Sequence, residues 1–229
     1  MRPFTPARRR GAEILDDPAT PPAVRERSQR DVVRSNTLLG GARAYRLAVR
    51  RAMPAGSGCT LLDVGAGLAD LPVRVAADAR SAGGRVTTIA ADRVEGLLRA
   101  GRARADHAVC ADALALPFRD SGADIVACSQ LLHHFERADA VRLVREMHRV
   151  ARRAVVVSDL RRSWVAAAGF WLVSFPLRFH RVTRHDGALS VLRGFTAPEL
   201  AGIVRDATGA APDVRRHFGF RLTATVARA

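Results

Sequence analysis

Residues 59–70 read CTLLDVGAGLAD, which is the pattern of a buried strand, a glycine turn and the start of a helix. Gly65 and Gly67 lack a Cβ, so the backbone can turn tightly there and come close to a ligand. Pro72 lies where the first turn of a helix tolerates proline, because the amide at that point has no partner within the helix. A strand that leads through such a turn into a helix N-terminus predicts a ligand site.

Strand and helix patterns alternate along the rest of the chain. Apolar, β-branched runs predict strands over 85–91, 107–111, 123–129 and 154–158, and helical spacing predicts helices over 69–82, 94–104 and 138–150. This alternation predicts an α/β fold with a doubly wound, mostly parallel, seven-stranded Rossmann-like sheet. Two strands over 214–220 and 222–226 should close it as an antiparallel hairpin.

The 229 residues predict a single domain, 1–229, with four parts. We expect an N-terminal helical cap over 23–53, a ligand-binding core over 57–160, a substrate-cap insertion over 161–195, and a C-terminal helix and strands over 196–229. Residues 1–22 are rich in proline and threonine, which predicts loose order. Polar turns are predicted over 34–41 and 183–187. Thr196 and Glu199 form a capping-box pattern, which predicts a helix that ends near Gly209.

The formal charge of +15 would ordinarily suggest nucleic acid or an anionic surface as a partner. All 37 basic residues are arginine and none is lysine, which is typical of a GC-rich genome that favours arginine codons. Apart from Arg8-Arg9-Arg10 and a few pairs, they are scattered along the chain. We therefore expect no nucleic-acid partner, although an RNA substrate stays open as an alternative.

The cysteines Cys59, Cys110 and Cys128 fall in or beside predicted strands and form no CxxC pair. They therefore predict neither a disulfide framework nor a metal site. The N-terminus has no apolar secretion signal, and no apolar run approaches the length of about 20 residues that spans a bilayer. These features predict a cytoplasmic protein.

Three acids follow predicted strands: Asp92, Asp112 and Asp159. In a doubly wound sheet, these strand ends face the ligand crevice. A ribose diol and an adenine amino group are donors that such acids could bind, although the acids could instead cap the helices that follow. Asp70 stands where a dinucleotide fingerprint has its third glycine, and its carboxylate would repel a pyrophosphate at the helix N-terminus. S-adenosylmethionine (SAM) has no phosphate and carries a cationic sulfonium, so it fits better.

Three segments carry a specific resemblance: 62–67 (LDVGAG), 112–118 (DALALPF) and 124–135 (DIVACSQLLHHF). They resemble the ordered motifs of class I SAM-dependent methyltransferases over roughly residues 60–159, most closely the small-molecule group that includes the ubiquinone and menaquinone biosynthesis methyltransferases. Ala69 departs from the glycine of that family. The resemblance implies SAM as cofactor and S-adenosylhomocysteine (SAH) as product. The implied cofactor residues are Asp63, Gly65 and Gly67 for the methionine part, Asp92 for the ribose, Asp112 and Ala113 for the adenine, and Ser129 and Gln130 near the sulfonium. Ala66 and Arg93 are also expected to contact the cofactor.

Methyl transfer to oxygen usually needs a base, and histidine titrates near neutral pH. His133 and His134 follow the strand over 123–129, next to the methyl position that the resemblance implies. His185, beside Asp186, is a third candidate. Each could instead have a packing or solvated role. Asp159 could orient a histidine or a phenol.

Five of the twelve aromatic residues lie between 163 and 179, where this fold commonly inserts its substrate cap. An aromatic and apolar lining suits a flat or lipidic acceptor. Ordinary core packing and peripheral contact with a membrane surface are alternative interpretations of this segment. The predicted substrate residues are Asn36, Asp159, Arg161, Trp164, Trp171 and Phe175.

Together these features predict methyl transfer to a small apolar acceptor of secondary metabolism, such as a phenol, a quinol or a polyketide-like aromatic. Transfer to oxygen is favoured, and carbon or nitrogen stays open. An RNA methyltransferase and a non-catalytic scaffold are the alternatives. We expect a monomer or homodimer.

Overall fold

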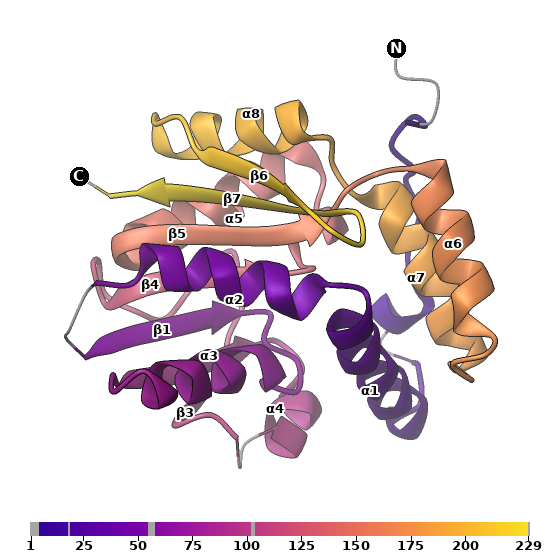
Figure 1. The fold of residues 1–229 in the computed structure, drawn as a ribbon, viewed down its shortest axis with the longest axis horizontal. Helices are drawn as coiled ribbons and strands as arrows, with labels where there is room; N and C mark the ends of the chain where they lie inside the picture. The colour runs from indigo at the N-terminus through magenta and orange to yellow at the C-terminus, as the bar shows by residue number, and fades with distance from the viewer. Residues whose placement is uncertain (1–4, 18, 55–57, 102–103, 229) are drawn as a thin grey trace.

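The computed structural model describes residues 5–17, 19–54, 58–101 and 104–228. Seven strands form one sheet in the order β3-β2-β1-β4-β5-β7-β6 (Figure 1). The strands from β1 to β5 pair in parallel, whereas β7 pairs antiparallel with both β5 and β6. The predicted doubly wound sheet and its antiparallel C-terminal pair are therefore confirmed.

The element bounds follow the chain. The strands are β1 (Cys59–Val64), β2 (Val86–Asp92), β3 (His107–Cys110), β4 (Ala123–Ser129), β5 (Ala151–Leu160), β6 (Asp213–His217) and β7 (Arg221–Ala227). The α-helices are α1 (Pro22–Leu38), α2 (Gly41–Ala52), α3 (Asp70–Ser81), α4 (Glu95–Gly101), α5 (Arg137–Val150), α6 (Trp164–Ser174), α7 (Arg181–Arg193) and α8 (Ala197–Thr208). Short 3-10 helices span Ile14–Asp16 (η1) and Leu132–His134 (η2).

Helices cover both faces of the sheet. Consecutive residues of a strand point to opposite faces, and on β1 Leu61 joins the core beneath α2 and α3, while Leu62 joins the core beneath α5 and α8. Tyr45 and Val75 belong to the core beneath α2 and α3, and the core beneath α5 and α8 contains more residues. In Figure 1, α2 and α3 lie in front of the sheet and α5 and α8 behind it.

A separate group of helices lies beyond the carboxyl ends of the parallel strands. Figure 1 shows α1, α6 and α7 together at that edge, with the N-terminal segment beside α7. The amides of Ile14 and Leu15 donate to the carboxylate of Asp186 on α7, each at 3.0 Å. The expectation that residues 1–22 are loosely ordered is therefore wrong for residues 5–17, because buried polar contacts hold this segment over the sheet edge.

Two predicted turns are helical. The polar stretch 183–187 lies inside α7, because its polar side chains face buried partners such as the η1 amides. The stretch 34–41 is mostly the end of α1, which runs to Leu38 and places Asn36 on a helix. The turn itself is Leu39-Gly40, where Gly40 has a φ of 79°.

The capping box of Thr196 and Glu199 is present at the start of α8. Residue 57, the predicted start of the core, and residues 102 and 103 of the predicted helix 94–104 lie outside the described residues. The four-part division of the chain stays a prediction. Among the described helices, none has the length and apolarity to cross a bilayer.

Candidate functional site

A cavity of about 570 Å³ lies at the carboxyl edge of β1, β2 and β4. Its wall includes all ten residues that the sequence predicted for the cofactor, which are Asp63, Gly65, Ala66, Gly67, Asp92, Arg93, Asp112, Ala113, Ser129 and Gln130. They come from the ends of four strands, β1 to β4, and the turns that follow them. We refer to this space as the first cavity.

The glycine turn after β1 has the backbone that its sequence predicts. Gly65 has a φ of 70°, and a Cβ there would lie 2.9 Å from a methyl carbon of Leu131. Gly67 donates its amide to Asp92 Oδ2 at 2.9 Å. Ala69, at a φ of 54°, also adopts the left-handed conformation. This conformation explains why a glycine suits position 69 in the family that the sequence resembles.

Two acids in the first cavity lack enough hydrogen-bond donors. Asp63 is 2% exposed and receives one hydrogen bond, from the hydroxyl of Tyr45 at 2.7 Å. Burial raises the pKa of Asp63 to about 8. Asp70 Oδ2 is buried without a hydrogen-bond partner, and burial also raises the pKa of Asp70. Arg74 Nε lies 3.7 Å from Asp70 Oδ2 and provides part of the counter-charge for that acid. A ligand with a sulfonium and an ammonium would add positive charge beside both acids, so these residues fit SAM.

Asp92 and Asp112 each hold the turn that follows their strand. Asp92 Oδ1 accepts from the amide of Val94, and Asp112 Oδ1 accepts from the amide of Leu114, both at 2.9 Å. Both acids also line the first cavity. Local turn stabilisation and ligand contact are therefore compatible for these acids, because a carboxylate has about four acceptor positions.

His133 is buried at the start of η2 and is oriented by Asp159 at the end of β5. The distance between His133 Nδ1 and Asp159 Oδ1 is 2.7 Å, and the amide of His133 donates to Asp159 Oδ2 at 3.1 Å. Burial by itself would raise the pKa of Asp159, but the charge and the hydrogen bond of His133 outweigh it and lower the pKa. With Nδ1 donating to Asp159, the Nε2 lone pair is free, and Nε2 is buried with no hydrogen-bond partner.

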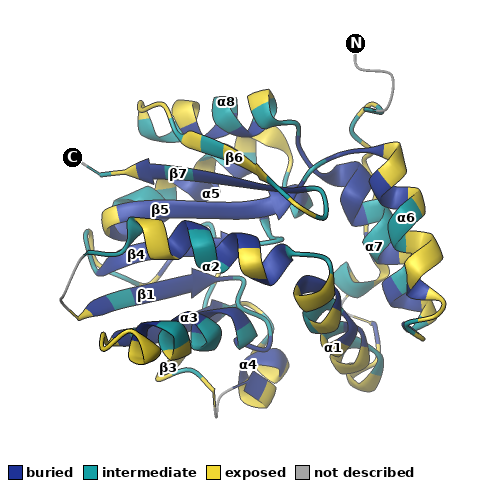
Figure 2. Cartoon of the chain, viewed as in Figure 1, coloured by how far each residue is buried: buried dark blue, intermediate teal, exposed yellow. Residues whose placement is uncertain are grey.

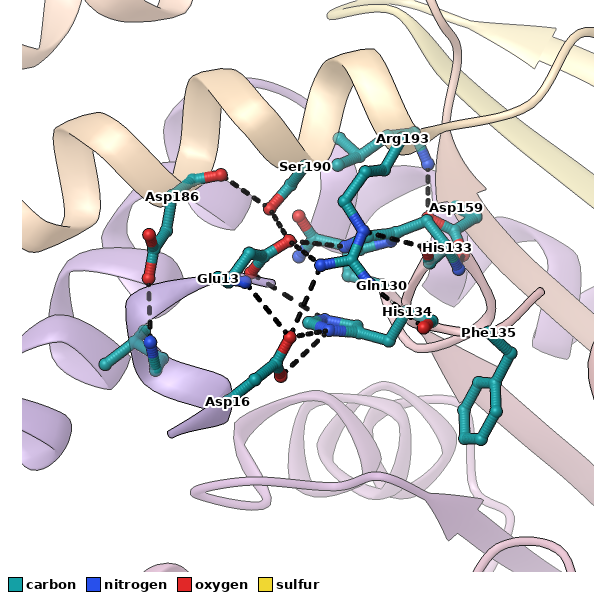
Figure 3. A network of polar contacts seen from close by, with 12 residues as sticks. Glu13, Asp16, Gln130, His133, His134, Phe135, Asp159, Asp186, Ser190 and Arg193 are labelled. Carbon is teal, nitrogen blue, oxygen red and sulfur yellow. Dashed lines mark hydrogen bonds and ion pairs between the residues drawn. The ribbon is translucent and has the colours of Figure 1, made fainter. Parts of the chain in front are cut away.

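The N-terminal segment brings Glu13 to the same place (Figure 3). Glu13 Oε1 accepts from Ser190 Oγ at 2.7 Å and lies 3.7 Å from His133 Nε2. Arg193 Nη1 is 3.4 Å from Glu13 Oε1. Burial raises the pKa of Glu13. A proton acceptor and a carboxyl group of raised pKa therefore face each other at the first cavity.

His134 belongs to the same network. Its Nδ1 lies 3.1 Å from Asp16 Oδ1, and its ring stacks at a tilt on that of His133, with the centroids 4.4 Å apart. Burial would raise the pKa of Asp16, but the hydrogen bond and charge of His134 outweigh it and hold that pKa well below its usual range.

Glu13, His133 and His134 are also spaced as ligands of a metal ion could be, with one atom from each within 4.8 Å of the others. The guanidinium of Arg193 already places a positive charge beside Glu13 and Asp16, at 3.4 and 3.3 Å. That charge opposes a second cation at the same point, so the cluster is better suited to holding protons than a metal.

A second cavity, of about 490 Å³, adjoins the first. The walls of the two cavities share Glu13, Leu15, Val32, Gln130 and Ser190. Most of the remaining wall is apolar and comes from the end of β5, from α6 and α7, and from the β6–β7 turn, including Leu160, Val165, Ala166, Phe170, Val173, Val191, Phe218 and Phe220. A molecule in the second cavity would therefore meet one in the first at Glu13 and Gln130.

The structure separates the predicted substrate residues. Asn36 lines the first cavity, where it accepts from Gln130 Nε2 at 2.6 Å, and Arg161 lines the second. Asp159 lies behind His133 and is 1% exposed. The expectation that the aromatic side chains line the cap is corrected for three residues, Trp164, Trp171 and Phe175, which are exposed and line neither cavity.

His185 is also placed away from both cavities. Its side chain is 59% exposed, and its Nδ1 lies 2.8 Å from Asp186 Oδ1. Among the three predicted catalytic histidines, only His133 and His134 line a cavity of the described residues.

Sequence reasoning missed three buried residues of the site. Glu13 lay in a proline-rich stretch with no periodic pattern, and Tyr45 had the spacing of an ordinary core residue. Arg221 lies in a strand pattern; it is 3% exposed, and its Nη1 donates to Gln130 Oε1 at 2.8 Å. Burial lowers the pKa of Arg221 to about 10. In a chain whose basic residues are all arginine, the sequence does not distinguish a buried arginine from the others.

Comparison with known families identifies the core. Residues 62–157 match the family described as a methyltransferase domain. Residues 62–157 therefore carry a methyltransferase domain. The match runs from within β1 to within β5 and contains the glycine turn, Asp92 and Asp112, whereas Asp159 lies just beyond it. No curated protein sequence matches the chain.

Solved structures share the fold of this methyltransferase domain at low identity. A Nostoc punctiforme structure provisionally named an O-methyltransferase has a TM-score of 0.62 and 15% identity, over 88% of this chain and 59% of that one. Magnesium protoporphyrin IX methyltransferase from Synechocystis with bound SAM has a TM-score of 0.54 and 12% identity, over 94% and 88%. An O-methyltransferase family 2 protein from Planctomyces limnophilus in complex with apigenin has a TM-score of 0.60 and 21% identity, over 94% and 67%. The chain thus spans about three fifths of the Nostoc protein.

Proposed function

We propose that this protein transfers the methyl group of SAM to a hydroxyl oxygen of a small apolar aromatic acceptor, such as a phenol, a quinol or a polyketide-like aromatic. The observation that carries the proposal is the shared wall of the two cavities. A cofactor in the first cavity and a flat apolar molecule in the second would meet beside Glu13, Gln130 and His133. The finer grouping with the quinone biosynthesis enzymes, the role in secondary metabolism, the cytoplasmic location and the monomeric or homodimeric state stay predictions.

The first cavity would hold SAM with the residues that the resemblance implies. Asp63 would face the amino-acid part, with Asp70 adding negative charge near the sulfonium. Asp92 and Arg93 would contact the ribose, and Asp112 and Ala113 the adenine. When bound, SAM supplies an electrophilic methyl group. The fixed turn amides and strand-end acids position it, and positioning is the main requirement of such a transfer.

The proton of the acceptor hydroxyl would pass to His133 Nε2. Asp159 holds the ring in the tautomer that leaves this lone pair free and stabilises the imidazolium that forms. As its O–H bond breaks, the acceptor oxygen would form its bond to the methyl carbon, and the bond between that carbon and the sulfonium sulfur would break, with SAH as the leaving group. Glu13, which shares the wall of the second cavity, is placed to hydrogen-bond the acceptor or the histidine.

The buried position of His133 Nε2, without a hydrogen-bond partner, favours oxygen as the acceptor atom. Transfer to a nucleophilic carbon or an amine would make less use of a base. An RNA substrate would need a charged groove at the methyl position, whereas the second cavity is mostly apolar.

Calorimetry with SAM and SAH tests cofactor binding, and SAH formation with a panel of phenols, quinols, anilines and RNA tests the acceptor. We expect binding of both cofactor forms and turnover with phenolic acceptors only. The absence of heat and of a thermal shift with SAM and SAH would refute the assignment of the first cavity. Turnover with RNA that weakens steeply with salt would instead favour the RNA alternative.

A further inference from the structure

Helix α6 is apolar on all sides, although its outer side faces solvent. Its inner residues Ala166, Gly169 and Phe170 line the second cavity. Its outer side exposes six large apolar side chains, which we call the α6 surface: Trp164, Val165, Trp171, Leu172, Val173 and Phe175. Figure 2 shows this exposed outer side at the edge of the molecule. A helix that is apolar all round is normally buried on all sides. The α6 surface is instead exposed to solvent in the described part of the chain.

The α6 surface is continuous with the second cavity. Val165 and Val173 are 52% and 39% exposed, and both also line that cavity. An apolar molecule could therefore pass from the outer side of α6 into the second cavity without crossing a polar rim at these two residues.

The charged residues that flank α6 in the sequence are all basic, although Arg162 among them is buried and paired with Glu199. From residue 160 to residue 185 the sequence contains five arginines and no acidic residue. Arg178 and Arg181 are exposed just after α6. Arg184 lies over the ring of Phe175 at 4.5 Å, and Arg9 lies over the ring of Trp164 at 5.6 Å. Arginines that surround exposed tryptophans match an anionic interface with an apolar interior.

We propose that the α6 surface docks on an anionic lipid membrane, and that the acceptor is a lipid-soluble aromatic that enters the second cavity from the bilayer between Val165 and Val173. The six apolar side chains would lie at the boundary between headgroups and acyl chains, and the arginines would contact the lipid phosphates. Docking itself is independent of the methyl transfer, whereas the route of the acceptor rests on the proposed function.

Vesicle co-sedimentation of the full chain tests the docking without SAM or acceptor. The probes are vesicles of phosphatidylcholine alone and vesicles with one third phosphatidylglycerol. We expect binding to the anionic vesicles that weakens with salt, and little binding to the neutral ones. Leu172→Glu should lower the partition coefficient by about tenfold or more. Leu38→Glu is the matched control, because Leu38 is similarly exposed (53% against 61%) but lies on α1.

A second pair of variants tests the charge. Arg181→Glu should weaken the binding to anionic vesicles, whereas Arg145→Glu, on α5 behind the sheet, should leave it unchanged. Equal binding of wild type and Leu172→Glu would overturn the proposal. So would a concentration-dependent dimer in lipid-free buffer that Leu172→Glu dissociates, because a second copy would then cover the α6 surface.

The route of the acceptor has its own readout. With phenols of increasing alkyl chain length, wild type should turn over the long-chain acceptors faster when they are presented in anionic vesicles than in detergent. Leu172→Glu should lose this difference and keep its turnover of short soluble phenols. Vesicle binding without any turnover would disprove the proposed function but leave the docking intact.

Discussion

His133 and Asp159 form a buried pair in which Nδ1 of the histidine lies 2.7 Å from Oδ1 of the aspartate, and the opposite ring nitrogen is buried 3.7 Å from Glu13 Oε1 without a hydrogen-bond partner. The two residues come from the segments after β4 and at the end of β5, which are neighbouring parallel strands. The pair is therefore a direct product of the sheet order. It fixes which nitrogen of the ring can accept a proton.

Asp159→Asn should lower kcat by about 100-fold or more while SAM binding stays near wild type. The asparagine amide would donate to Nδ1, so the ring proton would move to Nε2, and Nε2 could then no longer accept a proton. Rates of SAH formation and calorimetric SAM affinity measure the two effects. His185→Gln is the control, because His185 is exposed and lines neither cavity. Full turnover by Asp159→Asn would show that positioning alone drives the reaction.

SAM binding near pH 7 should release a proton, because Asp63 has a pKa of about 8 before the cationic ligand arrives. The ligand charge favours the carboxylate and lowers that pKa, so SAM affinity should rise as the pH increases toward 8. Calorimetry in buffers of different ionisation enthalpy measures the proton count. Asp63→Asn should abolish the release, while Asp213→Asn, on the surface, should keep it. A wild-type count of zero would contradict the assignment.

Glu13→Gln should change the pH dependence of stability. The raised pKa of Glu13 means that its contribution is fully present below the unfolded value of about 4.5 and is lost as the pH rises through the folded value. Glu13→Gln should therefore be more stable relative to wild type at pH 8 than at pH 5, which means that its free energy of unfolding exceeds the wild-type value by more at pH 8. Urea unfolding at both values measures this. Glu95→Gln, at an exposed position, should show no such difference, and parallel curves for Glu13→Gln and wild type would rule the effect out.

Gly187→Ala should loosen the acceptor site although alanine favours helix. A Cβ at position 187 of α7 would overlap the ring of Phe170 on α6, which lines the second cavity. The ring must then shift, and we expect a destabilisation of about 1–3 kcal/mol and a raised KM for the acceptor. Thermal unfolding and acceptor kinetics measure the two. Gly96→Ala, with open space around the added methyl, should instead stabilise α4. An unchanged KM for Gly187→Ala would mean that the acceptor does not contact Phe170.

An element of the fold could be predicted from the sequence where a local pattern determines it without distant partners. The buried run 123–129 became β4 with the same bounds, and Thr196 and Glu199 start α8 with both hydrogen bonds of a capping box. The glycine turn and strand-end acids could be placed together because parallel strands bring their carboxyl ends to one edge.

Features that depend on distant partners could not be predicted in this way. Thr183 to Gly187 resembles a turn until Asp31 and the η1 amides bind its polar side chains, and it then forms part of α7. The sequence of α6 did not indicate which aromatic side chains point inward, because a helix that is apolar on every side has no distinct inner face. Glu13 became part of the site through contacts with residues more than a hundred positions away.

The wall that the two cavities share makes their occupancies thermodynamically linked. A cofactor and an acceptor bound side by side would share contacts with Glu13 and Gln130, so whatever factor one adds to the affinity of the other should act equally in both directions. SAH differs from SAM in charge at the sulfur, near Asp70 and Gln130 in the proposed pose. Loss of that charge after transfer would weaken the hold on both molecules at once, which couples turnover to the release of both products.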